Sequence, residues 1–175
     1  MTRFIVLLRG INVNGRSLPM AELKQAARDG GFPDCVTYIQ SGNLVLSAKG
    51  DAADVEKAIE SLIEKQFGIK VEAIARSAAD FAAAAAANPF PEGLGKQIHL
   101  GLTKKPLKAG APEALAGRAT HGEEIVAAGG GLWINFTQGV ADSKLMPAVL
   151  DKAAGSTLTA RNWNTVQKLI ALAEA

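Results

Sequence analysis

The sequence has a single cysteine, Cys35, only two histidines and no long hydrophobic run among its 175 residues. One cysteine cannot form an internal disulfide, and such sparse use of cysteine is typical of a reducing compartment. The apolar run from Phe4 to Leu8 is too short for the core of a signal peptide, and no segment approaches the roughly 20 apolar residues of a membrane span. We therefore expect a cytoplasmic protein with no membrane partner.

The sequence also lacks the motifs that carry most enzyme chemistry. His99 and His121 have no cysteine or carboxylate at ligand spacing, so no metal site is predicted. There is no Gly-x-Ser-x-Gly elbow, no Walker-type or dinucleotide-binding glycine motif, and no evident acid–base pair. We accordingly predict no catalytic residue and no cofactor, and whether the protein is an enzyme stays open.

What is present is an ordinary globular composition, with 48% hydrophobic residues and a net charge of +2. That charge is too small to indicate a nucleic-acid partner by itself. Over residues 1–76 the pattern predicts the order βαββαβ, with helices bounded by Pro19, by Asp51 as a cap and by Gly68. The predicted strands are Phe4–Leu8, Cys35–Gln40, Leu44–Ser47 and Lys70–Ala75.

The order of elements repeats, with little residue identity, after an alanine-rich linker helix over Ser77–Ala87. The second set comprises a strand at Gln97–Leu102, a weak helix at Pro112–Ala119, hairpin strands Glu124–Ala128 and Leu132–Phe136, a helix over Lys144–Ala154 capped by Ser143, a short strand Thr157–Thr159 and an amphipathic C-terminal helix. We predict an α+β fold of two ferredoxin-like βαββαβ units in tandem: residues 1–76, a linker helix and loop over 77–96, and a second unit with the C-terminal helix over 97–175.

This topology predicts which loops meet. In the first unit the loop after strand 1 and the hairpin at residues 41–43 lie at the same end of the sheet. In the second unit the segments after the third and fourth strands share one end, where helices beginning near Ser143 and Asn162 would direct their N-termini. Helix N-termini with Lys144 and Arg161 beside them favour an anion, although both cations could equally satisfy local carbonyls or carboxylates.

Several short stretches together resemble the bacterial domain of unknown function 1697 family, over essentially the whole chain. These stretches are Leu8-Arg9-Gly10-Ile11-Asn12-Val13, Met20-Ala21-Glu22-Leu23, Thr37-Tyr38-Ile39-Gln40-Ser41-Gly42-Asn43, Asn88-Pro89-Phe90, Ser143-Lys144-Leu145 and Ala160-Arg161-Asn162-Trp163-Asn164-Thr165. The resemblance implies a duplicated ferredoxin-like architecture and no known activity. Most of these stretches fall on the two loop clusters that the topology predicts, which favours a functional surface there.

The leading hypothesis is a non-catalytic binding module for an anionic ligand: a nucleotide, a phosphometabolite or a nucleic-acid backbone. One alternative is an enzyme acting on a phosphorylated or acyl substrate, with Ser41, Asn43 and the arginines stabilising its negative charge. The other is a purely structural role for the motifs where the two units join. The candidate ligand-binding residues are Arg9, Gly10, Asn12, Arg16, Ser41, Gly42, Asn43, Ser143, Lys144, Arg161, Asn162 and Asn164.

Overall fold

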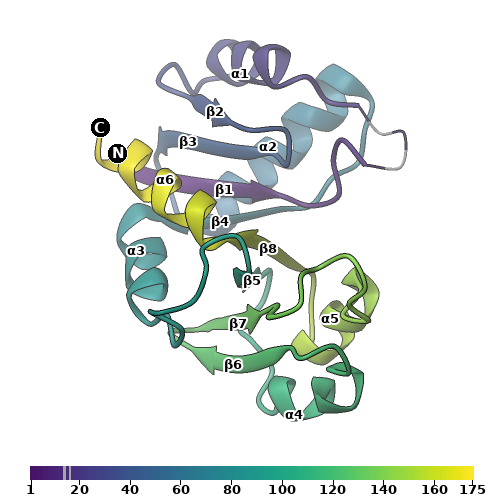
Figure 1. Ribbon diagram of the computed structural model, residues 1–175. Coiled ribbons are helices and arrows are strands. Elements are labelled where there is room, and N and C mark those ends of the chain that lie inside the picture. Colours follow the sequence, from purple (N-terminus) through teal and green to yellow (C-terminus); the bar gives the residue numbers. More distant parts are fainter. Residues whose placement is uncertain (14, 16) are drawn as a thin grey trace. The chain divides into compact units, whose positions relative to one another are not determined.

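A computed structural model of the chain describes residues 1–13, 15 and 17–175. Arg16, one of the predicted ligand-binding residues, lies outside the described residues. Over the described residues the fold is mixed α+β, with two four-stranded antiparallel sheets and six α-helices (Figure 1). This confirms the predicted α+β class. Contacts divide the chain into unit 1, residues 1–81 and 169–175, and unit 2, residues 82–168.

Unit 1 contains one sheet with the strand order β2-β3-β1-β4. Its elements are β1 (Thr2–Leu8), α1 (Met20–Asp29), β2 (Val36–Tyr38), β3 (Asn43–Ala48), α2 (Ala52–Phe67), β4 (Ala73–Ser77) and the start of α3 (Ala78–Ala86). The central strand β1 pairs antiparallel with both β3 and β4, so Leu7 lies opposite Asn43 and Leu8 opposite Ala73. The end of β1, the β2–β3 turn and the start of β4 therefore share one end of the sheet.

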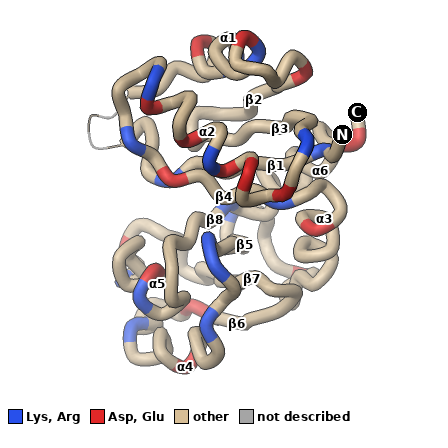
Figure 2. The backbone as a smooth tube through the Cα atoms, turned by 180° about the vertical axis from the view of Figure 1, so that it is seen from behind, with Lys and Arg blue, Asp and Glu red and all other residues tan. Residues whose placement is uncertain are grey.

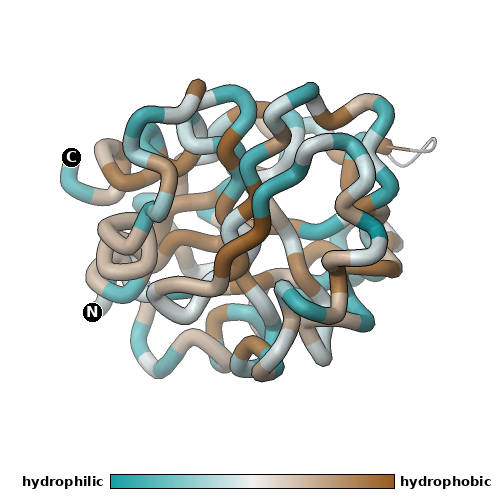
Figure 3. The backbone as a smooth tube through the Cα atoms, turned by 60° about the horizontal axis from the view of Figure 1, so that its bottom comes forward, coloured by the Kyte–Doolittle hydropathy of each residue, from teal (hydrophilic) through white to brown (hydrophobic). Residues whose placement is uncertain are grey.

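Strand β1 is buried on both faces. Each residue from Phe4 to Leu8 is at most 2% exposed. Phe4, Val6 and Leu8 belong to a core cluster with apolar residues of α1 and α2, such as Leu23 and Ile59. Figure 3 shows such hydrophobic stretches alternating with hydrophilic ones along the chain. Helices α1 and α2 thus cover one face of this sheet.

The two ends of α2 follow the local sequence signals. Asp51 accepts a hydrogen bond from the Asp54 backbone N–H at 2.9 Å, and the Asp54 carboxylate accepts one from the Asp51 N–H at 3.0 Å. This reciprocal capping box satisfies N–H groups that lack partners at a helix start. Gly68 ends the helix in the left-handed conformation, with φ of 67°. The predicted caps of this helix are confirmed.

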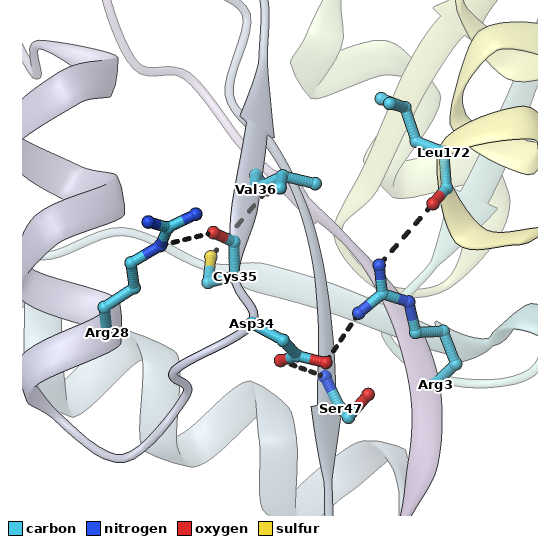
Figure 4. A network of polar contacts seen from close by, with 7 residues as sticks. All are labelled: Arg3, Arg28, Asp34, Cys35, Val36, Ser47 and Leu172. Carbon is cyan, nitrogen blue, oxygen red and sulfur yellow. Dashed lines mark hydrogen bonds and ion pairs between the residues drawn. The ribbon is translucent and has the colours of Figure 1, made fainter. Parts of the chain in front are cut away.

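A polar network joins four segments of unit 1 (Figure 4). Arg3 donates to the Asp34 carboxylate at 2.7 Å and to the Leu172 carbonyl of α6 (Trp163–Glu174) at 3.5 Å. Asp34 also accepts a hydrogen bond from the Ser47 N–H at 3.0 Å. Burial would raise the pKa of Asp34, but the hydrogen bonds from Ser47 and the charge of Arg3 outweigh it and lower that pKa. The network fixes the last turns of α6 beside β1 within unit 1.

Unit 2 contains a second sheet with the order β6-β7-β5-β8, which is the order of the first sheet with each strand number raised by four. Its elements are β5 (Ile98–Thr103), α4 (Ala111–Leu115) with a 3₁₀ turn (Ala116–Arg118), β6 (Glu124–Ala128), β7 (Gly131–Asn135), α5 (Pro147–Ala154), β8 (Leu158–Asn162) and the start of α6. Strands β3 and β7 carry no charged residue and are tan in Figure 2.

Several boundaries in unit 2 differ from the prediction, and two of these differences have a clear physical cause. Helix α5 begins at Pro147 with Met146 as its cap, so Ser143 does not cap it; the Ser143 hydroxyl donates to Glu123 instead, at 2.7 Å. Strand β8 continues to Asn162, beyond the predicted end at Thr159, because it pairs with β5 up to His99.

In this unit Trp133 is fully buried, with its ring 5.8 Å from that of Trp163. No helix of the described part of the chain has the length and apolarity to cross a membrane.

Cys35 should react slowly with alkylating reagents in the folded protein. Its thiol is buried, and burial, reinforced by the negative charge of Asp34, raises the pKa to about 11. At pH 8 roughly one thiol in a thousand would be the reactive thiolate, against about a quarter in an unfolded chain. We expect iodoacetamide labelling followed by mass spectrometry to be at least about 100-fold slower in buffer than in urea. Equal rates would contradict the burial of this thiol.

Candidate functional site

Three segments meet at one end of the unit 1 sheet, and we call residues 9–13, 39–43 and 70–72 the unit 1 loop edge. The Leu8 N–H donates to the Gly42 carbonyl at 2.9 Å, which joins the exit of β1 to the β2–β3 turn. The Arg9 N–H donates to the Glu72 carbonyl at 3.0 Å, which joins the same exit to the approach of β4. The loop edge therefore brings together Arg9, Gly10, Asn12, Ser41, Gly42 and Asn43 of the predicted residues.

The Asn12 side chain holds two loops together. Asn12 has a left-handed backbone, with φ of 53°. Its amide group donates to the Gln40 carbonyl at 2.7 Å and to the Leu18 carbonyl at 3.1 Å, and its oxygen accepts from the Leu18 N–H at 2.7 Å. Asparagine is among the few residues that tolerate this conformation. Asn12 thus fixes the chain that follows Arg9 against the β2–β3 turn.

The β2–β3 turn is held from inside by Asn43. Asn43 is fully buried, and its amide donates to the Tyr38 carbonyl at 2.8 Å and to the Ser41 hydroxyl at 3.1 Å. Ile39 within this turn has φ of 47° although it is β-branched and 46% exposed. Such a conformation costs energy and persists only when its surroundings impose it. Hydrogen bonds thus hold the turn in a shape that its sequence alone would not favour.

A hollow of about 320 Å³ opens between the exit of β1 and the approach to β4, lined by Arg9, Gly10, Lys70, Val71 and Glu72. Burial alternates along residues 70–72: Val71 is 7% exposed and packs in the core, whereas Lys70 and Glu72 are exposed. In an extended segment this alternation places the charged side chains of Lys70 and Glu72 on the same side. The Lys70 ammonium also lies 4.0 Å from the Glu64 carboxylate at the surface.

Lys70 and Glu72 were missed as site residues in the sequence analysis. The same topological argument that grouped the loop after β1 with the β2–β3 turn also places the start of β4 at that end. Figure 2 shows positions of Lys and Arg interspersed with positions of Asp and Glu along the backbone. A small mixed-charge hollow fits that distribution better than a nucleic-acid surface does.

In unit 2, Arg161 lies within β8 and is 7% exposed. Its guanidinium donates to the Thr159 hydroxyl at 2.8 Å and to the Ala160 carbonyl at 3.0 Å. Burial lowers the pKa of Arg161 to about 10, so it is still a cation at neutral pH. Because buried charges need hydrogen-bond partners, Thr159 and the carbonyl of Ala160 stabilise this side chain inside the fold.

Ser143 and its neighbours surround a carboxylate. The Ser143 hydroxyl donates to Glu123 at 2.7 Å, the His121 N–H donates to the other Glu123 oxygen at 2.6 Å, and the Leu145 N–H donates to the Ser143 hydroxyl at 3.2 Å. Burial acts to raise the pKa of Glu123, but the hydrogen bonds from Ser143 and the backbone outweigh it and lower that pKa. Glu123 is thus negatively charged beside Ser143, and Lys144 is exposed nearby in sequence.

Asn162 and Asn164 lie at the start of α6. Asn162 accepts a hydrogen bond from the Thr165 N–H at 2.9 Å and so caps the helix. The Trp163 N–H donates to the Gly95 carbonyl at 3.0 Å, and the Asn164 side chain occupies the space that a Cβ on Gly95 would need. These contacts hold the start of α6 against the approach to β5.

Among residues 1–13, 15 and 17–175, no group of three His, Cys, Asp or Glu could hold a metal ion.

Comparison with known proteins identifies a family and a fold. A family model described as "Protein of unknown function (DUF1697)" matches residues 1–133, which confirms the resemblance over that range; the stretches at 143–145 and 160–165 lie outside the matched residues. A similar solved structure is that of the conserved bacterial protein SP0830 from Streptococcus pneumoniae, with a TM-score of 0.73, 22% identity and 98% of each chain covered. No protein with a curated description is significantly similar to this sequence. At this identity the structural likeness shows the fold alone.

Replacing Gly42 by alanine should destabilise unit 1. Gly42 has φ of 89°, and an added Cβ would lie 2.5 Å from the Ile11 Cδ1 atom. Gly68 has φ of 67° with open space around it and is the matched control. We expect Gly68→Ala to lower the free energy of unfolding by about 1–2 kcal/mol through backbone strain. Gly42→Ala should cost about 1–3 kcal/mol more through overpacking, measured by urea denaturation. Equal losses would contradict the close packing of this turn.

Arg161→Ala should lower the free energy of unfolding by about 2–4 kcal/mol, because it leaves buried polar groups without their donor and opens a cavity. Lys144→Ala, which removes an exposed cation from another signature stretch, should change it by less than about 0.5 kcal/mol. Chemical denaturation of both variants tests this contrast. A small effect of Arg161→Ala, comparable with that of Lys144→Ala, would show that the guanidinium does not support the fold.

Proposed function

This chain belongs to the DUF1697 family of proteins of unknown function, and we propose that it is a non-catalytic binding protein for a small anionic ligand. The ligand would be a nucleotide or a phosphorylated metabolite, bound in the hollow of the unit 1 loop edge. The observation that carries the proposal is the pairing of Arg9 and Lys70 around one hollow of about 320 Å³. Guanidinium and ammonium groups are the side chains that bind phosphate and carboxylate best.

The surroundings of the hollow support binding because contacts within the protein hold them in place. Val71 anchors the wall in the core, and the hydrogen bond from Arg9 to Glu72 fixes the backbones on its two sides. The side-chain amide of Asn12 holds the loop after Arg9, and that of Asn43 holds the β2–β3 turn. A site ordered before binding loses less conformational entropy when the ligand arrives. In this proposal Asn12, Ser41, Gly42 and Asn43 shape the site, and Arg9 and Lys70 contact the anion.

For the signature residues of unit 2 we propose a structural role. Arg161 donates inside the fold, Asn162 caps α6, and Ser143 donates to Glu123, whose negative charge would repel an anion. An enzyme using Asn43 to stabilise a reacting oxygen is less well supported, since its amide donates to Tyr38 and Ser41 within the turn. Nucleic acid is also a weaker candidate, because the hollow contains the carboxylate of Glu72.

We further propose that the two units are repeats of one ferredoxin-like plan that arose by duplication. Both have the element order βαββαβ, and the two sheets share one strand order when the strands of unit 2 are renumbered from one. In this plan the loop edge of unit 1 and the corresponding end of unit 2 would be equivalent positions. The loop edge of unit 1 contains two cations around a hollow, and for the signature residues of unit 2 we propose a structural role, so in this proposal the repeats have diverged in function.

The binding proposal predicts that anions stabilise the wild-type protein against heat through the loop edge. A ligand at 100 times its dissociation constant adds about 2.7 kcal/mol to the free energy of unfolding. We expect a raised unfolding midpoint with inorganic phosphate or nucleoside monophosphates. Arg9→Gln and Lys70→Gln should each weaken binding about tenfold in calorimetric titration, since each removes one charge-assisted contact.

Lys57→Gln is the matched control for that experiment. Lys57 is exposed on α2 and does not line the hollow, so its loss changes net charge equally without touching the site. Affinity should then stay within about twofold of wild type. The binding proposal fails if no anion of the panel shifts the wild-type midpoint. The assignment to this hollow fails if Lys57→Gln weakens binding as much as Lys70→Gln does.

A further inference from the structure

We infer that unit 1 has a second binding site, between α1 and α2, for a small zwitterion with an apolar body, such as a free apolar amino acid. The site is a hollow of about 480 Å³ between residues 26–32 and 58–66, which we call the α1–α2 hollow. It is larger than the hollow of the unit 1 loop edge and shares no lining residue with it. Its volume lies within the roughly 300–1,000 Å³ typical of ligand pockets.

Each helix contributes one face to the α1–α2 hollow. The lining positions 26, 29 and 30 at the end of α1 follow the helical pattern i, i+3, i+4, and positions 58, 61, 62, 65 and 66 of α2 continue it to i+7 and i+8. Gly30 allows the end of α1 to come close to α2, because an added Cβ would clash with the Leu62 Cδ1 atom. The walls therefore belong mainly to two packed helices.

Part of the lining is apolar and continuous with the core. Phe32 and Leu62 are partly buried and pack against the core of unit 1. The Phe32 N–H donates to the Ala27 carbonyl at 2.9 Å, which fixes the chain that leaves α1. Ala26 and Ala58 have small side chains, so room is left above these two larger ones. An apolar group bound there would remove the exposed parts of Phe32 and Leu62 from water, which favours binding.

The charged residues of the lining have opposite signs and come from different helices. Asp29 is the last residue of α1, where the partial negative charge of the helix end disfavours a carboxylate and favours a cation. Gln25 donates to Asp29 at 2.9 Å, but a neutral amide leaves the charge in place and a carboxylate can accept several further hydrogen bonds. Lys65 lies exposed in the last turn of α2. The two walls are thus complementary to an ammonium group and a carboxylate.

A ligand that satisfies the whole lining carries both charges and an apolar group. In a free apolar amino acid the ammonium group would bind Asp29 and the end of α1, the carboxylate would bind Lys65, and the side chain would cover Phe32 and Leu62. A phosphorylated ligand fits less well, because its negative charge would lie close to Asp29 and the negative end of α1. The competing interpretation is that Asp29 and Lys65 only attract each other across the surface, which is worth little in water.

Three matched compounds separate these interpretations: L-phenylalanine with both charges, 2-phenylethylamine without the carboxylate, and 3-phenylpropanoate without the ammonium group. Each is titrated into the isotope-labelled full chain and followed by NMR chemical shifts. We expect L-phenylalanine to shift the amide signals of Gly30 and Leu62 and to bind about tenfold more tightly than either analogue, since each analogue lacks one charge-assisted contact.

Charge variants test the role of each wall. Asp29→Asn should weaken binding of L-phenylalanine about tenfold without weakening that of 3-phenylpropanoate, and Lys65→Gln should do so without weakening that of 2-phenylethylamine. Glu22→Gln and Lys57→Gln are the matched controls, because these residues are exposed on the same helices and do not line the α1–α2 hollow. Both controls should stay within about twofold of wild type. Unfolding midpoints without ligand check that all four variants fold.

The inference is overturned if L-phenylalanine leaves the signals of Gly30 and Leu62 unchanged, if either analogue binds as tightly, or if a control weakens binding as much as its matched variant does. Shifts confined to Arg9 and Gly10 would also overturn it, because they would place the compound at the unit 1 loop edge. Since the two hollows share no lining residue, these outcomes leave the anion proposal to its own test with inorganic phosphate and Arg9→Gln.

Discussion

The burial of β1 on both faces is the constraint on which the rest of unit 1 depends. With every residue from Phe4 to Leu8 at most 2% exposed, the strand can only be central, paired on each side by β3 and β4. Helices α1 and α2 cover the face of Phe4, Val6 and Leu8. Because buried side chains and ladder hydrogen bonds hold the strand in the sheet as far as Leu8, the chain leaves the sheet at Arg9. The packing of residues 4–8 thus determines where Arg9 lies.

The loop edge illustrates how a family signature can combine residues with different physical roles. Asn12 and Asn43 make their hydrogen bonds to backbone carbonyls, so their amides define the shape of the loops. Gly42 is required where a Cβ would meet Ile11, and Ile39 accepts an unfavourable backbone conformation beside it. Each of these features stabilises one arrangement of the turn against alternatives. The side chains of Arg9, Lys70 and Glu72 then face a hollow whose walls are already fixed.

The sequence correctly predicted features that depend on residues close together in the chain. The caps of α2 at Asp51 and Gly68 were correct because both act within one helical turn, and β6 was predicted with its observed bounds. Ser143 was wrongly predicted to cap a helix because its preferred partner, Glu123, is distant in sequence. The end of β8 was misplaced because residues 160–162 belong to the strand through their pairing with β5, which is distant in sequence. The hydrogen bond from Arg161 to Thr159 also stabilises this part of the strand. The hollow itself depends on Lys70 and Glu72, which no motif marks.

Arg9 and Arg161 show why a signature arginine cannot be assigned to binding from sequence alone. Arg161 is 7% exposed, and the cost of burying its charge, evident in a pKa lowered to about 10, is offset by donors directed at Thr159 and Ala160. Its hydrogen bonds contribute to folding. Arg9 is half-buried beside a hollow, so water leaves its guanidinium at a smaller cost when an anion arrives. The two residues have the same side-chain chemistry, but Arg161 contributes to stability, whereas Arg9 is the one that we propose for recognition.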